Sequence, residues 1–140
     1  MAPADRSARD RLAWEREVRA LIAEMDRTVA TVVVEGKRDE QALRDLGVET
    51  PIVACARTAG LLEVSRSIDG EPIAILTDYD EHGRKLNGKL RDYLPDGRVE
   101  SRWRRELGLL LTQRGHYDVE SLNGIADRPG WAPEEWRDDR

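Results

Sequence analysis

Two short hydrophobic runs that end in acidic residues stand out in the pattern of hydrophobic and polar positions. The first run, residues 28–34, leads to Glu35, and the second, residues 73–76, leads to Asp78 and Asp80. Such runs are typical of strands buried on both faces, as in a parallel sheet covered by helices. Because the carboxyl ends of parallel strands share one edge of a sheet, we expect the acidic residues to lie together there.

The rest of the pattern predicts helices between these strands. Hydrophobic residues recur at helical spacing over residues 4–26, which indicates an extra N-terminal amphipathic helix. After it, the pattern predicts strand 28–34, helix 39–46, strand 51–54, helix 61–67, strand 73–76, helix 81–94, strand 98–100 and helix 101–114. Asp39 and Ser101 are the expected N-caps of two of these helices. Alternating strands and helices indicate an α/β fold with a parallel sheet of about four strands, joined by right-handed crossovers.

The chain divides into three expected segments. Residues 1–27 form the helix that packs on the domain, residues 28–126 form the α/β domain, and residues 127–140 form an irregular tail rich in Pro, Gly and charge. Residues 116–126 remain ambiguous. A length of 140 residues fits one domain rather than two.

Composition narrows the classes of protein and of metal site. No stretch is apolar enough for a membrane span or a signal peptide, so we predict a cytoplasmic protein with no membrane partner. Cys55 is the only cysteine, and His82 and His116 are the only histidines, which excludes an intrachain disulfide and a zinc cluster of the usual spacing. A bound metal would therefore be a hard cation held by oxygen.

The charge balance limits the kind of nucleic-acid surface the chain can have. A net charge of -5 excludes a wholly basic surface but allows a local basic face. Of the 23 basic residues 20 are Arg, which suits phosphate recognition but also reflects genomic base composition or a salty habitat in many proteins. Arg98, Arg102, Arg104 and Arg105 form either a solvated face, which we favour, or a basic rim for nucleic acid.

The acidic residues after the two strands suggest metal-assisted chemistry. Asp78 and Asp80, one residue apart at a strand end, can share a divalent cation, and Mg2+ takes one or two carboxylates with water and phosphate as its other ligands. Glu35 would be a further ligand or a general acid or base. The neighbouring basic residues Lys37, Arg38, Arg84 and Lys85 could neutralise phosphate charge. The simpler interpretation is that Asp78 and Asp80 are solvated loop residues.

Taken together, the two motifs resemble those of the Toprim domain, which type IA and type II topoisomerases, bacterial primases, recombination proteins and small nucleases share. One motif is a hydrophobic strand ending in Glu35-Gly36, with a downstream acidic residue at Asp39. The other is a hydrophobic strand ending in Asp78-x-Asp80-x-x-Gly83. The resemblance covers residues 29–111 and is strongest to the small 5S-rRNA-maturing ribonucleases and the archaeal primase-like proteins.

The resemblance implies a Toprim-like Rossmannoid fold and phosphodiester chemistry with Mg2+, or with Mn2+ as the alternative. It implies that Glu35 is the general acid or base and that Asp78 and Asp80 hold the metal. Gly36 and Gly83 would allow close approach of a phosphate. Polar contacts to nucleic acid would come from Thr58, Gly60 and Arg84. The implied partner is nucleic acid, RNA more than DNA, with a further protein supplying substrate recognition because the chain has no separate domain for it.

Three functional hypotheses follow from the sequence. The leading one is a small metal-dependent nuclease. The second is a non-catalytic module that binds nucleic acid with the help of a metal and positions another enzyme. The third is a receiver-like signalling domain, which also uses strand-end acids, but such a domain needs a late lysine and no lysine follows Lys89.

Overall fold

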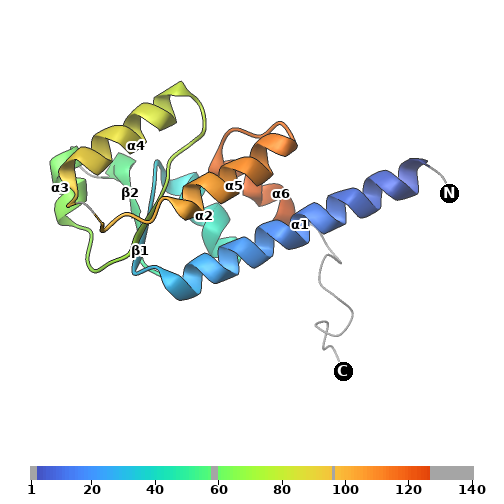
Figure 1. The fold of residues 1–140 in the computed structure, drawn as a ribbon, viewed down its shortest axis with the longest axis horizontal. Coiled ribbons are helices and arrows are strands. Elements are labelled where there is room, and N and C mark those ends of the chain that lie inside the picture. Colours follow the sequence, from blue (N-terminus) through green and yellow to red (C-terminus); the bar gives the residue numbers. More distant parts are fainter. Residues whose placement is uncertain (1–2, 58–59, 96, 127–140) are drawn as a thin grey trace.

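A three-stranded parallel sheet forms the centre of the computed structural model, which describes residues 3–57, 60–95 and 97–126 (Figure 1). The strands are β1 (Thr31–Val34), β2 (Ile52–Ala54) and β3 (Ile73–Leu76), in the order β2-β1-β3. Both neighbours of β1 run parallel to it. The predicted α/β class with a helix-flanked parallel sheet is confirmed.

Helices cover both faces of the sheet (Figure 1). One face packs against α1 (Pro3–Thr28), α2 (Lys37–Asp45), α5 (Arg102–Gln113), the short helix η2 (Val119–Leu122) and α6 (Asn123–Ala126). The other face packs against α3 (Leu61–Arg66) and α4 (Glu81–Tyr93), and the 3-10 turn η1 (Cys55–Arg57) follows β2. The molecule is therefore a helix-sheet-helix sandwich.

The two hydrophobic runs of the sequence are continuous because β1 and β3 are buried on both faces. Every residue of both strands is buried. Val34 and Leu76 belong to the core under α1, α2 and α5, whereas Val33 and Ile75 belong to the core under α3 and α4. Each such side chain contributes about 1.5–3 kcal/mol through burial. The sheet is thus held in place from both sides.

Helix α1 is 26 residues and therefore about 39 Å long, and its N-terminal turns extend beyond the rest of the molecule (Figure 1). Its hydrophobic stripe, which includes Val18, Ile22 and Met25, is buried in the core. The indole Nε1 of Trp14 donates a hydrogen bond of 2.6 Å to the carbonyl of Leu110 in α5. The helix is part of the packed domain along its C-terminal turns.

The predicted fourth strand is reduced to one parallel bridge, between Ile73 and Val99, in the part of the chain that the structure describes. The amide of Ile73 donates to the carbonyl of Arg98 (2.8 Å), and the amide of Glu100 donates to the carbonyl of Ile73 (2.9 Å). The pairing ends there because α5 begins at Arg102, directly after this contact. The sheet therefore has three strands rather than four.

Of the two predicted N-caps, Ser101 is at the predicted position and Asp39 is not. Gly36, not Asp39, occupies the N-cap position of α2, and the carboxylate of Asp39 instead accepts a hydrogen bond of 3.0 Å from the amide of Gly36. Ser101 does occupy the N-cap position of α5, but its side chain makes no capping hydrogen bond. The N-cap is the last residue with a non-helical backbone before the helix begins, and Gly36 is extended here.

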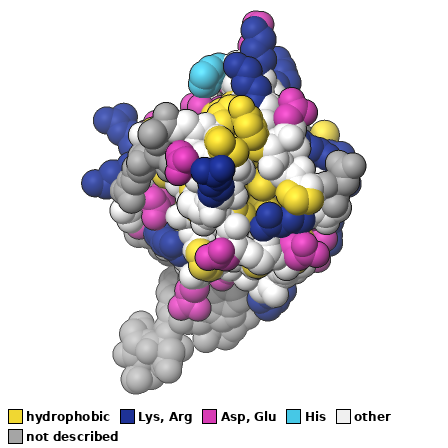
Figure 2. All heavy atoms as spheres, turned by 90° about the vertical axis from the view of Figure 1, so that its left-hand side faces the viewer, with side chains coloured by type: hydrophobic (Ala, Val, Ile, Leu, Met, Phe, Trp, Pro, Cys, Tyr) yellow, Lys and Arg dark blue, Asp and Glu magenta, His cyan; other side chains and the backbone are white. Residues whose placement is uncertain are grey.

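The surface is mixed in character. Among the described helices, none is long and apolar enough to cross a membrane. Figure 2 shows the face at the α3 side of the molecule, where hydrophobic side chains lie among acidic and basic ones. The exposed hydrophobic residues include Leu62 of α3 and Tyr93 of α4. This face is not uniformly basic, in keeping with the net charge of -5.

We predict opposite effects for two Gly→Ala changes in helices. A Cβ at Gly108 of α5 would lie 2.6 Å from Cε1 of Tyr79, a buried ring whose hydroxyl donates to the carbonyl of Arg104. Gly108→Ala should lower the free energy of unfolding by about 1–2 kcal/mol, since overpacking outweighs the gain in helix propensity. Gly88→Ala in α4 meets no atom within 4 Å and should raise it by about 0.5–1 kcal/mol. Urea unfolding measures both, and a stabilised Gly108→Ala variant would contradict the packing described for Tyr79.

Candidate functional site

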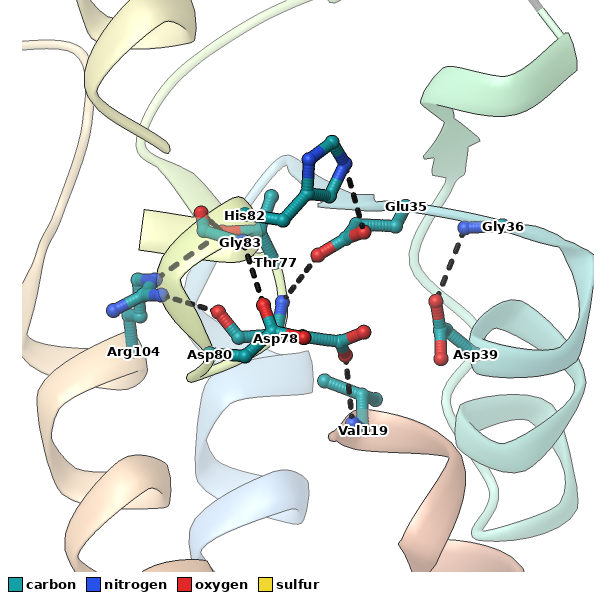
Figure 3. A network of polar contacts seen from close by, with 10 residues as sticks. All are labelled: Glu35, Gly36, Asp39, Thr77, Asp78, Asp80, His82, Gly83, Arg104 and Val119. Atoms are coloured by element: carbon teal, nitrogen blue, oxygen red, sulfur yellow. Dashed lines mark hydrogen bonds and ion pairs between the residues drawn. The ribbon is translucent and has the colours of Figure 1, made fainter. Parts of the chain in front are cut away.

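The site lies at the carboxyl ends of β1 and β3, which stop side by side. Val34 pairs with Leu76 in the parallel register, so the residues that follow the two strands lie next to each other. The amide of Asp78 donates a hydrogen bond of 2.7 Å to Oε2 of Glu35 (Figure 3). The structure therefore brings together the acidic residues that end the two hydrophobic runs.

Asp78 carries the strongest electrostatic signal of the site. Its Oδ1 accepts a hydrogen bond of 3.0 Å from the amide of Val119 in η2. The pKa of the Asp78 carboxyl is raised to about 6, mainly by partial burial and also by the nearby charges of Glu35, Asp39 and Asp118, against the lowering effect of the Val119 amide. The site holds more negative charge than its surroundings neutralise, and a bound cation would relieve that excess.

Asp39 belongs to the same group of charges. Its side chain is buried, and burial raises the pKa of its carboxyl, as do the charges of Glu35, Glu120 and Asp118. The acidic cluster, defined as Glu35, Asp39, Asp78 and Asp118, thus combines residues from the ends of β1 and β3, the first turn of α2 and the start of η2. Four separate parts of the chain contribute to one acidic site.

The side chain of Asp80 caps a helix, unlike that of Asp78. It is exposed, and its Oδ1 accepts a hydrogen bond of 2.7 Å from the amide of Gly83, which makes it the N-cap of α4. Gly83 is required for packing, because a Cβ there would lie 2.0 Å from the carbonyl oxygen of Asp78. Thr77 adds a third link, since its hydroxyl donates to the carbonyl of Gly83 at 2.7 Å. The turn from β3 to α4 is therefore closely fixed.

In the part of the chain that the structure describes, this site offers few protein ligands for a metal. Within the described residues, no three His, Cys, Asp or Glu side chains are arranged so that they could hold a metal ion. Mg2+ commonly takes only one or two carboxylates and keeps several waters. Asp78 and Asp80 each use one carboxylate oxygen for a backbone amide, so a second oxygen of each is left for a cation.

The basic residues predicted to neutralise phosphate lie on the surface around this site. Lys37 and Arg84 are exposed. Arg38 forms an ion pair with Glu120 (3.5 Å), and Lys85 forms one with Glu81 (3.1 Å). Thr58 lies outside the described residues, and Gly60 is the N-cap of α3. None of these observations assigns a phosphate contact to them.

His82 lies closer to the acidic cluster than these surface residues. Its Nε2 is 3.8 Å from Oε1 of Glu35, and most of its side chain is exposed. Gly36 differs from Gly83 in that a Cβ there would meet nothing within 4 Å. Space for a ligand therefore exists beside Gly36, on the Glu35 side of the site.

Arg104 is the site residue that the sequence interpretation missed. Its Nη2 donates a hydrogen bond of 2.7 Å to the carbonyl of Asp78, and its guanidinium lies over the ring of Tyr79, 4.6 Å from Cζ to the ring centroid. The sequence favoured a solvated face for the arginines of this helix. The signal was present, because positions 104, 107, 108 and 111 form one helical stripe and the other three are buried.

The amide of Val119 was a second omission. The segment before it also bonds to the site, since the amide of Tyr79 donates to the carbonyl of Tyr117 at 2.7 Å. Backbone donors leave no mark on residue type, so the sequence could not reveal this contact. Asp118, three residues before Ser121, is a capping pattern that could have located η2, and its carboxylate does accept from the amide of Ser121.

Comparison with known proteins places the chain in a family. No family model matches it. It is 37% identical to a UPF0292 protein of Pyrococcus furiosus, covering 74% of this chain and 82% of the relative. The chain belongs to the UPF0292 family. A further UPF0292 relative from Thermococcus onnurineus is 42% identical over 75% of this chain and 80% of its own length, and one from Methanocaldococcus jannaschii is 33% identical over 65% and 73%.

One solved structure is similar to this UPF0292 protein in fold. It is a protein from Aquifex aeolicus, with a TM-score of 0.54 and 22% sequence identity, and the match covers 78% of this chain and 94% of that one. At this level of identity the likeness concerns the fold alone. It shows that the arrangement of helices and strands described above occurs in another protein.

We predict that Asp78 makes stability depend on pH. Its pKa is raised from about 3.9 in the unfolded chain to about 6 in the folded one, so the folded state binds the proton more tightly. The contribution of Asp78 to stability should therefore be largest below about pH 4 and should be lost as pH rises through about 6. Asp78→Asn should remove this loss and stabilise the protein by about 1–2 kcal/mol at neutral pH.

Urea unfolding between acidic and neutral pH, in the presence of a chelator, measures this effect. Asp92→Asn, at an exposed position of α4, is the matched control and should retain the wild-type pH dependence. An Asp78→Asn variant with the same pH dependence as the wild type would contradict the electrostatic description of the cluster.

Proposed function

We propose that this UPF0292 protein is a Toprim-like, Mg2+-dependent phosphodiesterase that cleaves nucleic acid, with RNA favoured over DNA. The observation that carries the proposal is the hydrogen bond from the amide of Asp78 to Oε2 of Glu35. It joins the two motifs of the Toprim resemblance at one edge of a parallel sheet. Open α/β sheets commonly have their active sites at this edge.

The fold also supports the proposal. The bridge between Ile73 and Val99 lies on the side of β3 where a fourth strand of a Toprim sheet would pair. The strand order β2-β1-β3 makes β1 the central strand, so that Glu35 follows the strand with neighbours on both sides. Both features are consistent with a Toprim-like sheet that is shortened at one edge.

In the proposed reaction Asp78 and Asp80 would hold the Mg2+ ion. When bound, the ion would polarise the scissile phosphate and stabilise the charge that develops on it. Burial and, to a smaller extent, neighbouring acidic charges raise the pKa of Asp78, and those acidic charges would favour the approach of a cation. The amide of Val119 fixes the orientation of the Asp78 carboxylate through Oδ1.

Glu35 would transfer a proton. Its Oε2 is occupied by the Asp78 amide, which leaves Oε1 to accept or donate the proton. The Nε2 of His82 lies 3.8 Å from Oε1, and a protonated imidazole there would stabilise negative charge on that oxygen. A general acid or base needs hydrogen-bond reach to the reacting group, and the open space beside Gly36 would admit a phosphodiester.

A second function is favoured by one observation. Asp80 already caps α4, and the described residues contain no three-ligand metal cluster. A protein that binds nucleic acid, with metal assistance but without cleavage, would need no stronger metal site. In this alternative the chain would position another enzyme, which would supply the catalytic residues.

We predict that Glu35→Gln and Asp78→Asn each reduce cleavage by at least about a hundredfold, because general acid–base catalysis alone contributes this much. The assay uses labelled structured RNAs and DNAs, with Mg2+ or with chelator. Glu63→Gln, at an exposed position of α3, is the matched control and should cleave like the wild type. Circular dichroism checks that all variants are folded.

Each outcome decides between the two functions. Cleavage that requires both Mg2+ and Glu35 supports the enzyme. Full turnover by either site variant would contradict it. Tight binding without any cleavage by the wild type would favour the adaptor.

A further inference from the structure

An arginine-lined pocket lies between α4 and α5, on the side of β3 opposite to β1. Its volume is about 260 Å³, and its base is formed by Ile75 and Val99. Its walls carry Asn87 and Arg91 from α4 and Ser101, Arg104 and Arg105 from the start of α5. Among the described residues, no acidic one lines it, although the chain as a whole is acidic. We call this feature the arginine groove.

The arginines of the groove are not used up by ion pairs. Within the described residues, neither Arg91 nor Arg105 has an acidic partner, and both are exposed. Arg102, by contrast, forms ion pairs with both Glu24 and Glu106. Two cations therefore face a pocket without local neutralisation, which favours binding of an anion.

Arg104 connects the groove to the acidic cluster. It lines the groove, and its Nη2 donates to the carbonyl of Asp78. Figure 3 shows Arg104 on one side of Asp78, and Glu35 and Asp39 on the other. The charge of Arg84 also acts on Arg104, so the positive field extends toward the start of α4. An anion in the groove would thus lie beside Arg104, which contacts the backbone of Asp78.

The open edge of β3 adds a backbone donor to the groove. Alternate residues of a parallel strand bond to opposite neighbours, so Ile75 faces the same edge as Ile73. The pairing with residues 98–100 ends at Glu100, and within the described chain no backbone hydrogen bond continues it to Ile75. Ile75 is buried and lines the groove, so the β3 edge toward which its amide points borders the groove.

These observations together point to a phosphodiester as the ligand. The planar guanidinium group matches the geometry of phosphate oxygens, and Asn87 and Ser101 add neutral donors. The volume of about 260 Å³ is below the range of about 300–1,000 Å³ common for small-molecule sites, so the groove suits a phosphate with its flanking sugar rather than a whole cofactor.

We propose that the arginine groove binds a backbone phosphate of the nucleic-acid strand. This phosphate would be the neighbour, along the strand, of the phosphodiester that lies at Glu35 and Asp78. The inference depends on the proposed function for the identity of the ligand. It adds a substrate-positioning site, formed by Arg91 and Arg105, that is separate from the acidic cluster. Binding of the nucleic acid in the groove would hold the neighbouring phosphodiester at the ends of β1 and β3.

The test measures binding without catalysis. Fluorescence anisotropy of short labelled single-stranded RNA and DNA, in chelator, compares the wild type with the double variant Arg91→Gln and Arg105→Gln. The variant should bind at least about tenfold more weakly, and the slope of log affinity against log salt should fall by about 0.7, because the groove would neutralise one phosphate of a single strand.

A matched double variant removes the same charge elsewhere. Lys89→Gln and Arg16→Gln change exposed positions of α4 and α1 that do not line the groove. This control should retain wild-type affinity and salt dependence apart from the small effect of net charge. If both double variants bound the oligonucleotides equally weakly, the proposal that the groove binds phosphate would be wrong. Failure of the wild type to bind either oligonucleotide would also contradict it.

Two further outcomes separate the ligand from the catalytic proposal. A labelled acidic peptide that binds as tightly as the oligonucleotides, with the same dependence on Arg91 and Arg105, would overturn the assignment to phosphate. Groove-dependent binding of RNA or DNA by a wild-type protein that never cleaves would support the groove and contradict the nuclease. The two proposals can therefore fail independently.

Discussion

The parallel pairing of β1 with β3 is the constraint on which the site depends. The register that pairs Val34 with Leu76 fixes where both strands stop. A shift of one residue would send the buried side chains of either strand to the opposite face. It would also separate Glu35 from the Asp78 amide, which are now joined by a hydrogen bond of 2.7 Å. The hydrophobic cores on both faces thus determine the geometry of the acidic cluster.

The environment of Asp78 shows how the fold maintains concentrated negative charge. Backbone amides, rather than cationic side chains, satisfy the carboxylates: Val119 for Asp78, Gly83 for Asp80 and Gly36 for Asp39. Arg104 contacts the carbonyl of Asp78 instead of its carboxylate. Burial and the neighbouring acidic charges still raise the pKa of Asp78, although the hydrogen bond from Val119 lowers it. A structure that needed only stability would gain by pairing these charges, and their clustering is one reason why we propose a functional site here.

The sequence predicted the elements that hydrophobic periodicity controls. Continuous burial of β1 and β3 made their runs unambiguous, and the alternation of strands and helices indicated a parallel sheet. The fourth strand could not be judged, because the length of the 98–100 segment depends on where α5 begins. The cap of α2 was misassigned because Gly36 and Asp39 both favour such positions and only tertiary context selects between them.

The candidate site was predictable only in part, for a physical reason. Acidic residues at strand ends are visible in a sequence, and the Glu35–Asp78 contact followed from parallel topology. The inward position of Arg104 required attention to its helical stripe, and the amide of Val119 comes from a segment with no clear pattern. The roles of Glu35, Asp78 and Asp80 in metal binding and proton transfer remain proposals.

Paramagnetic broadening by Mn2+ in amide NMR spectra tests the central claim most directly, because the ion broadens signals near its binding site. Substoichiometric Mn2+ should first broaden the amides of Gly36, Asp78 and Val119, and Asp78→Asn should remove this selective effect, whereas Asp92→Asn should not. Uniform broadening along the exposed acidic surface, or the same selective broadening in Asp78→Asn, would contradict a divalent-metal site at the ends of β1 and β3.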